Sequence, residues 1–349
     1  MSTRITRRAS AALIAGAIGS IGLGSLPALA ATQLTGAGSS FVYPFFSKAF
    51  YAYSQAHSDV TVNYQSIGSG GGIQQFTAKT VDFGASDVPM NADELKRASG
   101  NVVQVPVALG GVAVTYNLPV TVPGGLKLTR EAVVDIYLGK ISRWNDPVLE
   151  KLNPRAGLPN LPIVTVHRSD ASGTTYIFTD FLSNVAKDWK DKVGTGKSVQ
   201  WPGSNAVGAK GNEGVAGQVR QATGGIGYVE LAYAMENKLS TAQLENKAGK
   251  SVFCTASTVR AAAATKPTVS ATDFSIVDRP GANAYPISGY TWAFVYENPT
   301  DKARAKIVRD VLTWVTGDDA QKIAASLNYV ALPEPVQETA KKALAEVKV

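Results

Sequence analysis

Two kinds of residue that interact with anions in opposite ways stand close together in this sequence. Ser69 lies in a glycine-rich turn, Ile67-Gly-Ser-Gly-Gly-Gly-Ile73, which opens into a run with a helical pattern. A serine at a helix start can cap the helix, while the free backbone N–H groups of the first turn bind an anion. A short strand then ends at Asp87, whose carboxylate would repel an anion. The stretch predicts an anion-binding turn with a carboxylate whose role has to be explained.

The turn Gly36-Ala-Gly-Ser-Ser40 has the same arrangement earlier in the chain. It follows a short strand and precedes an apolar, aromatic run from Phe41 to His57 with a helical pattern, so Ser40 is expected near a helix cap. Taken alone, a serine at a helix start is most often only a cap, and each turn by itself is weak evidence for a ligand.

A third turn of this kind contains an arginine. Strand-like residues 162–167 lead into Arg168-Ser-Asp-Ala-Ser-Gly-Thr174, which opens another helical run. Arg168 can offer a bidentate fork to phosphate or sulfate, with Asp170 holding it in orientation, and the alternative is a surface ion pair. Helix N-termini that converge with serine hydroxyls and one arginine bind a tetrahedral oxyanion without a metal. The three turns together favour such a site.

Strands that alternate with helices indicate a parallel sheet, and ligands of such folds bind at the carboxyl ends of the strands. Residues 101–117, interrupted by Gly110-Gly111, and residues 285–296 form two long strand-like runs that are expected to carry the chain between two lobes. The sequence shows no internal repeat of fixed period. Further helices are expected at a capping box in 91–94 and at residues 129–138, 208–222, 255–264, 301–316, 320–327 and 336–347, and a proline-rich loop at 153–162.

The composition is that of a globular protein with enough material for two lobes, since 45% of the 349 residues are hydrophobic and 17% are charged. Arginines at positions 4, 7 and 8 precede an acid-free apolar run and Ala28-Leu-Ala30, which predicts a secretory signal at residues 1–30. General secretion is favoured over twin-arginine export. With no later run of about 18 apolar residues and no cysteine at the cleavage site, a mature protein free in the periplasm, without a lipid anchor, is expected.

Charge and the remaining reactive residues narrow the function classes. Without residues 1–30 the formal charge falls from +7 to +4, and no basic run is interleaved with aromatics, so nucleic acid is not expected as a partner. Cys254 is the only cysteine and is expected to be a buried, inert thiol. Neither His57 nor His167 is placed to activate a serine, and no cluster predicts a metal or another cofactor. These features argue against an enzyme.

In combination, the motifs closely resemble the periplasmic phosphate-binding proteins of high-affinity phosphate ABC transporters. The matching stretches are Thr35-Gly-Ala-Gly-Ser-Ser-Phe41, Gly68-Ser-Gly-Gly-Gly72, Val81-Asp-Phe-Gly-Ala-Ser-Asp87, Asp135-Ile-Tyr-Leu-Gly-Lys-Ile141, Arg168-x-Asp-x-Ser-Gly-Thr174 and Gly225-Ile-Gly-Tyr-Val-Glu230. The resemblance implies a type II periplasmic-binding-protein fold, two α/β lobes joined by a hinge of crossing strands. One lobe would comprise residues 31–112 and 286–349 and the other residues 113–285, closing over one phosphate.

Carried over position by position, the resemblance implies a set of phosphate-binding residues. Ser40 stands where the family often has threonine, which keeps the hydroxyl, and Gly70 replaces a common serine, which leaves the backbone donors intact. Asp170 would support Arg168. The implied binding residues are Ser40, Phe41 through its backbone N–H, Ser69, Asp87, Arg168, Ser172, Gly173 and Thr174.

The resemblance also gives Asp87 a role as a selectivity filter. Phosphate near neutral pH still carries a proton that it can donate to a carboxylate, whereas sulfate is fully ionised and would be repelled. The expected function is phosphate binding and delivery to a membrane permease by a monomer. The alternatives are a hydrolase of phosphate esters, a binding protein for another oxyanion such as sulfate, and phosphate binding that serves signalling or surface attachment.

Overall fold

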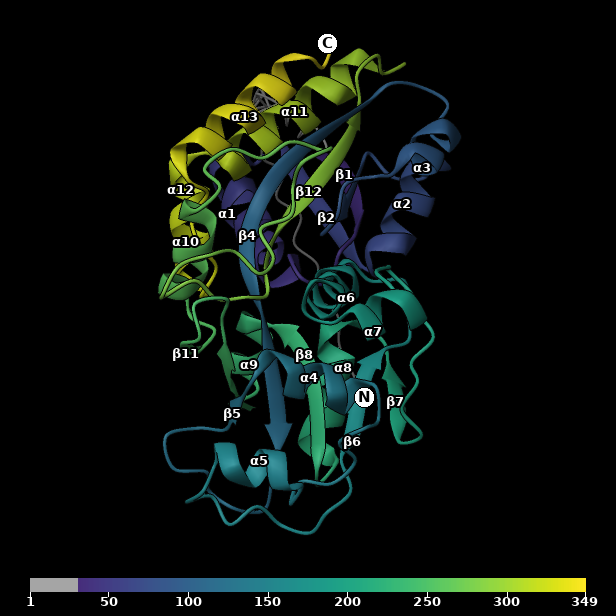
Figure 1. Ribbon diagram of the computed structural model, residues 1–349. Helices are drawn as coiled ribbons and strands as arrows, with labels where there is room; N and C mark the ends of the chain where they lie inside the picture. Colours follow the sequence, from purple (N-terminus) through teal and green to yellow (C-terminus); the bar gives the residue numbers. More distant parts are fainter. Residues whose placement is uncertain (1–30) are drawn as a thin grey trace, which may run out of the picture. The chain divides into compact units, whose positions relative to one another are not determined.

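The computed structural model describes residues 31–349, and the signal sequence predicted at residues 1–30 lies outside the described residues (Figure 1). One sheet runs through the described residues in the order β2-β1-β3-β12-β4-β8-β6-β7, with β9 also paired to β4. Its strands are β1 (Thr32–Gly38), β2 (Val60–Ser66), β3 (Phe83–Ser86), β4 (Val102–Asn117), β6 (Val164–Arg168), β7 (Ala206–Ala209), β8 (Gly225–Glu230), β9 (Ser240–Thr241) and β12 (Ser288–Tyr296). A small second sheet joins β5 (Lys127–Leu128), β10 (Gln243–Glu245) and β11 (Ser251–Val252).

Strand β4 connects two parts of the large sheet. Its residues 102–111 pair antiparallel with β12, and its residues 112–117 pair antiparallel with β8. The expected interruption at Gly110-Gly111 is wrong, because the strand continues through both glycines and only its pairing partner changes there. A Cβ atom at Gly110 would lie 2.8 Å from the ring of Phe41, so the strand needs glycine there for packing rather than for a break.

The two parts of the sheet repeat one topology. We call β2, β1, β3, β12 and residues 102–111 the first half-sheet, and β7, β6, β8, residues 112–117 and β9 the second half-sheet. In each, three parallel strands are followed by one strand of opposite direction and one of the original direction, and the three parallel strands follow one another along the chain in the same spatial order. Equivalent strands therefore deliver equivalent turns, and the turn after β1 corresponds to the turn after β6.

Helices connect the parallel strands and cover the sheet. Figure 1 shows α11, α12 and α13 together near β4, and α11 and α13 contact that strand while α12 contacts α1. The helices are α1 (Tyr43–Ala56), α2 (Ser69–Thr77), α3 (Ala92–Arg97), α4 (Arg130–Tyr137), α5 (Pro147–Leu152), α6 (Gly173–Val185), α7 (Lys187–Lys192), α8 (Gly211–Gln221), α9 (Leu231–Glu236), α10 (Ala256–Ala264), α11 (Lys302–Thr316), α12 (Asp318–Ser326) and α13 (Glu334–Ala345).

Most of the local signals in the sequence are confirmed. In the capping box that starts α3, Asn91 accepts from the Glu94 N–H at 2.9 Å and Glu94 accepts from the Asn91 N–H at 3.0 Å. Cys254 is buried as expected, and burial raises the pKa of its thiol well above the ordinary value. Within residues 31–349, no helix is both long enough and apolar enough to cross a bilayer.

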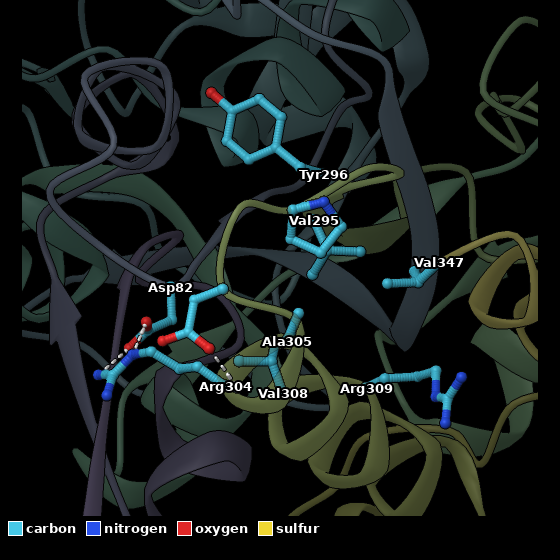
Figure 2. A pocket seen from close by; sticks show the side chains of 10 residues that line it. Asp82, Val295, Tyr296, Arg304, Ala305, Val308, Arg309 and Val347 are labelled. Atoms are coloured by element: carbon cyan, nitrogen blue, oxygen red, sulfur yellow. Dashed lines mark hydrogen bonds and ion pairs between the residues drawn. The ribbon is translucent and has the colours of Figure 1, made fainter. Parts of the chain in front are cut away.

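An ion pair ties the first half-sheet to α11 (Figure 2). Asp82 accepts from the Thr35 N–H at 2.7 Å and from Arg304 through both Nε and Nη2, the latter at 2.8 Å. Arg304 also donates to the carbonyl of Gln33 at 2.6 Å. The carboxylate of Asp82 is largely buried, so it holds the middle of β1 and the start of β3 against helix α11.

We expect Asp82→Ala to lower the free energy of unfolding by about 2 kcal/mol, because the backbone N–H of Thr35 and the guanidinium of Arg304 lose a charged acceptor. Urea denaturation measures the change. The matched control is Asp310→Ala, which removes an exposed ion pair with Lys306 on α11 and should change stability by less than about 0.5 kcal/mol. Equal effects of the two substitutions would contradict the role given to Asp82.

Candidate functional site

The predicted site residues meet where the carboxyl ends of β1, β2, β3 and β6 lead into their turns. Asp170 is half-buried, and the hydroxyls, Asp87 and the guanidinium of Arg168 are withdrawn from solvent. Because the two half-sheets supply different members, the site is assembled by their approach. The buried members are Ser40, Phe41, Ser69, Asp87, Arg168, Ser172, Gly173 and Thr174.

Ser69 joins the two half-sheets. The expected cap is wrong in detail: Gly68 is the N-cap of α2, and Ser69 is the first residue of the helix and makes no capping bond. Its Oγ instead accepts from the N–H of Gly173, at 3.0 Å, and from the N–H of Asp87, at 3.3 Å. The N–H of Gly70 donates to the carbonyl of residue 171 at 2.9 Å. The first turns of α2 and α6 are thus in direct contact.

Ser40 is also not a cap. Helix α1 begins two residues beyond the expected position, at Tyr43, with Val42 as its N-cap. The Oγ of Ser40 accepts from Asn212 twice, from the backbone N at 3.1 Å and from Nδ2 at 2.9 Å. The carbonyl of Ser40 accepts from the hydroxyl of Tyr233 at 2.7 Å. Two helices that pack with the second half-sheet, α8 and α9, therefore hold the turn that follows β1 in the first half-sheet.

Ser172 is the N-cap of α6, as the sequence predicts, and accepts from the N–H of Thr175 at 3.1 Å. Two residues further on, Thr174 accepts from Nδ2 of Asn212 at 3.2 Å and from Nη1 of Arg168 at 3.5 Å. The hydroxyl oxygens of Ser172 and Thr174 therefore already accept hydrogen bonds from N–H groups of the protein.

Asp170 binds Arg168 side-on. Nε of Arg168 donates to Oδ1 of Asp170 at 2.7 Å, and Nη2 donates to Oδ2. Burial would raise the pKa of Asp170, but the hydrogen bonds and charge of Arg168, with a bond from the N–H of Gly211 at 3.1 Å, lower that pKa below its ordinary value. A Cβ at Gly68, whose φ is +83°, would lie 2.1 Å from Oδ2 of Asp170. The ion pair therefore packs against the glycine turn of the first half-sheet.

Asp87 is the only acid among these predicted anion-binding residues and is 2% exposed. Its Oδ1 accepts from Oγ1 of Thr291 at 2.8 Å and from Oγ of Ser39. Burial raises the pKa of Asp87 to about 6, although the hydroxyls of Ser39 and Thr291 and the charge of Arg168 act in the opposite direction. Both of these bonds fall on Oδ1, and the hydroxyl of Thr174 also lies near the carboxylate and lowers its pKa.

The hydroxyls are arranged to donate. A serine or threonine hydroxyl has one proton and two lone pairs. The Oγ atoms of Ser40 and Ser69 each accept two N–H bonds, as does Oγ1 of Thr174, so the proton of each hydroxyl is what is left to offer. Together with the positive ends of helices and Arg168, they form a donor set that suits an anion. Asp87 adds one acceptor, which suits an anion that itself carries a proton.

Sequence reasoning missed several residues that support the site. Asn212 is the second residue of α8 and follows a glycine-rich turn with the same pattern of strand, turn and helix, but it carries no hydroxyl that would mark it as an oxyanion ligand. Lys197, 103 residues from Glu94 along the chain, forms a largely buried ion pair with it, and no local pattern could reveal that pairing. Ser39 and Thr291 contact Asp87, and only Ser39 lies in a turn that the sequence singles out.

A family model described as a PBP superfamily domain matches residues 25–319. The phosphate-binding protein PstS of Xylella fastidiosa is 46% identical over 303 residues, which are 86% of this chain and 82% of the relative. The chain belongs to the phosphate-binding proteins. PstS of Haemophilus influenzae is 43% identical over 323 residues, covering 91% of this chain and 94% of the relative. Members of this family are named for binding a substrate rather than for catalysis.

The fold class of the phosphate-binding proteins agrees with the topology described above. A solved high affinity periplasmic phosphate-binding protein bound with phosphate has a TM-score of 0.73 and 22% identity, covering 89% of this chain and 93% of that chain. A phosphate-binding protein from Stenotrophomonas maltophilia has a TM-score of 0.70 and 21% identity, covering 89% and 93%. The family resemblance and the two-lobed type II periplasmic-binding-protein fold expected from the sequence are confirmed.

The raised pKa of Asp87 predicts that the ligand-free protein loses stability as the pH rises from about 4 to about 6. In this window the folded protein keeps a proton that the unfolded chain, with an ordinary carboxyl pKa of about 4, has released. The unfolded state thus binds fewer protons, and a rise in pH favours unfolding. Asp87→Asn removes the titrating group and should flatten this part of the profile in urea unfolding without ligand. An unchanged slope would contradict the raised pKa.

Proposed function

We propose that this protein binds inorganic phosphate in the periplasm and delivers it to the permease of an ABC transporter. The names of its relatives support phosphate as the ligand, since PstS proteins from three bacterial genera match over most of the chain. The signal sequence expected at residues 1–30 supports export, and we propose that the mature protein acts as a monomer without a lipid anchor, a metal or another cofactor.

The observation that carries the proposal is the position of Asp87 among hydrogen-bond donors. A site for any anion needs only the hydroxyls, the helix N-termini and Arg168. A buried carboxylate beside them makes the site worse for an anion without protons, because it adds repulsion and an unpaired acceptor. It makes the site better for hydrogen phosphate, whose own proton it can accept. We therefore propose that Asp87 selects phosphate over sulfate.

The binding groups are proposed at the positions that match the motifs of the family. Arg168, held by Asp170, would supply the charge, and Phe41 and Gly173 would donate through backbone N–H groups. Hydroxyl donors would come from both half-sheets, and Asp87 would accept the proton of the ligand. The hydroxyl residues are Ser40, Ser69, Ser172 and Thr174.

We also propose that the two half-sheets are the cores of two lobes, residues 31–112 with 286–349 and residues 113–285, which close over the ion. Strand β4 changes its pairing partner between positions 111 and 112, which supports a hinge there. The contacts of Ser69 with Gly173 and of Lys197 with Glu94 connect the half-sheets and support a closed state in the structure. An ion held by both lobes must enter while they are apart.

A hydrolase is not favoured by the surroundings of the serines. A nucleophilic serine needs an adjacent base. Nδ1 of His167 contacts its neighbour's carbonyl at 3.0 Å, and its ring stacks on Trp201 with the ring centroids 4.9 Å apart. Burial lowers the pKa of His167, which favours the neutral imidazole that a base requires. Its ring nevertheless packs against Trp201 and, among the described residues, makes no hydrogen bond to any serine of the site. We therefore propose a binding protein and not an enzyme, and absence of turnover with an aryl phosphate is the expected result.

Calorimetry of the protein stripped of phosphate tests the selectivity. Phosphate and arsenate, which share a protonation state, should bind, and sulfate should bind roughly 10⁴-fold more weakly or not at all. Asp87→Ala should reduce the ratio of phosphate to sulfate affinity by about 100-fold or more. In the wild type the ratio should also narrow as the pH falls through about 6, because a protonated Asp87 no longer repels sulfate.

The control for that titration is Asp319→Ala, which removes an exposed acid on α12 and should leave all three affinities unchanged. Wild-type protein that binds sulfate as tightly as phosphate would contradict the proposed function. A ratio that is the same in Asp87→Ala as in the wild type would contradict only the role of Asp87.

The ion pair between Lys197 and Glu94 should slow phosphate release. It links α3 of the first half-sheet to a loop of the second and is largely buried. Lys197→Met is expected to raise the dissociation rate about tenfold with little change in the association rate, because the pair forms only after closure. Stopped-flow fluorescence measures both rates. Lys192→Met, which removes an exposed pair within α7, is the matched control, and equal dissociation rates would refute the idea.

A further inference from the structure

Asn212 is a fully buried residue in the first turn of α8 that contacts hydroxyls from both half-sheets. Its backbone N–H and its Nδ2 both donate to Oγ of Ser40, at 3.1 and 2.9 Å. Nδ2 also donates to Oγ1 of Thr174 at 3.2 Å. One side chain therefore connects a proposed ligand group of the first half-sheet with one of the second.

The orientation of the Asn212 amide is fixed from behind. Its Oδ1 accepts from the backbone N–H of Glu230 at 2.9 Å, and a backbone N–H can only donate. If the amide turned over, Nδ2 would face that N–H, donor against donor. Glu230 is itself held in place, because its carboxylate accepts from the N–H of Ala232 at 2.7 Å and caps α9. The end of β8 thus forces the NH₂ group of Asn212 toward the two hydroxyls.

The orientation of the Asn212 NH₂ group determines the direction in which the hydroxyl protons of Ser40 and Thr174 point. Ser40 receives two N–H bonds from Asn212, which use both lone pairs of its Oγ. Thr174 receives one from Asn212 and one from Nη1 of Arg168. Neither oxygen can accept again, so each hydroxyl proton must be donated away from Asn212. A donor that is oriented before the ligand arrives does not have to be reorganised on binding.

We infer that Asn212 is a positioning residue that sets the proton direction of Ser40 and Thr174, so that both hydroxyls face an oxyanion only as donors. The inference rests on the proposed function, because the oxyanion it refers to is phosphate. It gives the start of α8 a part in recognition although Asn212 itself need not touch the ion.

The test is a mutant cycle in which phosphate affinity is measured by calorimetry. Asn212→Leu, of similar size but without the side-chain donor, should weaken phosphate binding about tenfold, because Ser40 and Thr174 each lose the bond from Nδ2 while the backbone N–H at position 212 still donates to Ser40. Asn212→Asp replaces the donor by an acceptor of the same shape, turns the hydroxyls inward and should cost about 100-fold. Each substitution is repeated in a background of Ser40→Ala with Thr174→Val, where it should have less than a threefold effect beyond the added charge.

The charge effect of the aspartate is read directly, because that background without hydroxyls reports repulsion alone. Asn298→Asp, on an exposed loop, is the matched control and should bind as the wild type does. If Asn212→Asp does not fold, as judged by urea unfolding without ligand, the test uses Asn212→Leu alone and compares its effect on phosphate affinity with and without the two hydroxyls. A merely structural role would lower affinity by the same factor in both backgrounds.

The outcomes separate the two proposals. Losses that shrink when the hydroxyls are absent support the inference. Losses of equal size in both backgrounds, or no loss in either Asn212 variant, overturn it while phosphate binding by the wild type stands. Wild-type protein that shows no heat with phosphate overturns the proposed function and this inference with it.

Discussion

The first turns of two helices meet at the centre of this protein, and both present the positive end of the helix dipole. The N-terminus of α2 faces that of α6 through Ser69 and Gly173, and the guanidinium of Arg168 lies beside them. Like partial charges at this distance repel. Asp170 offsets part of the charge, and Asp87 a further part. Positive charge therefore remains in excess where the two helix N-termini meet, and a bound anion would neutralise it.

Two opposing effects set the pKa of Asp87. Burial favours its neutral form, while Ser39, Thr291 and Arg168 favour the charged one, and the balance leaves its pKa at about 6. A carboxylate in a fully apolar site would stay protonated and act as a donor, and one bound more strongly by cations would repel every anion. An intermediate pKa leaves Asp87 charged near neutral pH and able to accept a proton from its guest.

The repeated topology explains why support for the site comes from places without a motif. Equivalent strands of the two half-sheets end in α2 and α8, so Asn212 occupies the second half in nearly the position that Ser69 has in the first. The third parallel strand of the first half is followed by Asp87, and that of the second half ends at Glu230; both are buried acids. Asp87 lies in the ligand site, whereas Glu230 caps α9 and fixes Asn212. One architecture thus supplies an acceptor in one half and a positioning group in the other.

The sequence by itself determined the fold class, most helix limits and the turns that carry the site, because these depend on local signals: capping boxes, glycines and apolar periodicity. Ser172 as a cap and Arg168 with Asp170 two residues away are local in this sense. Tertiary structure decided the rest. Ser40 and Ser69 are not caps, because residues about 100 to 170 positions away supply better donors for their oxygens. Thr291 beside Asp87, Lys197 beside Glu94 and Asn212 beside Ser40 follow only from the approach of two half-sheets, which no short stretch of sequence records.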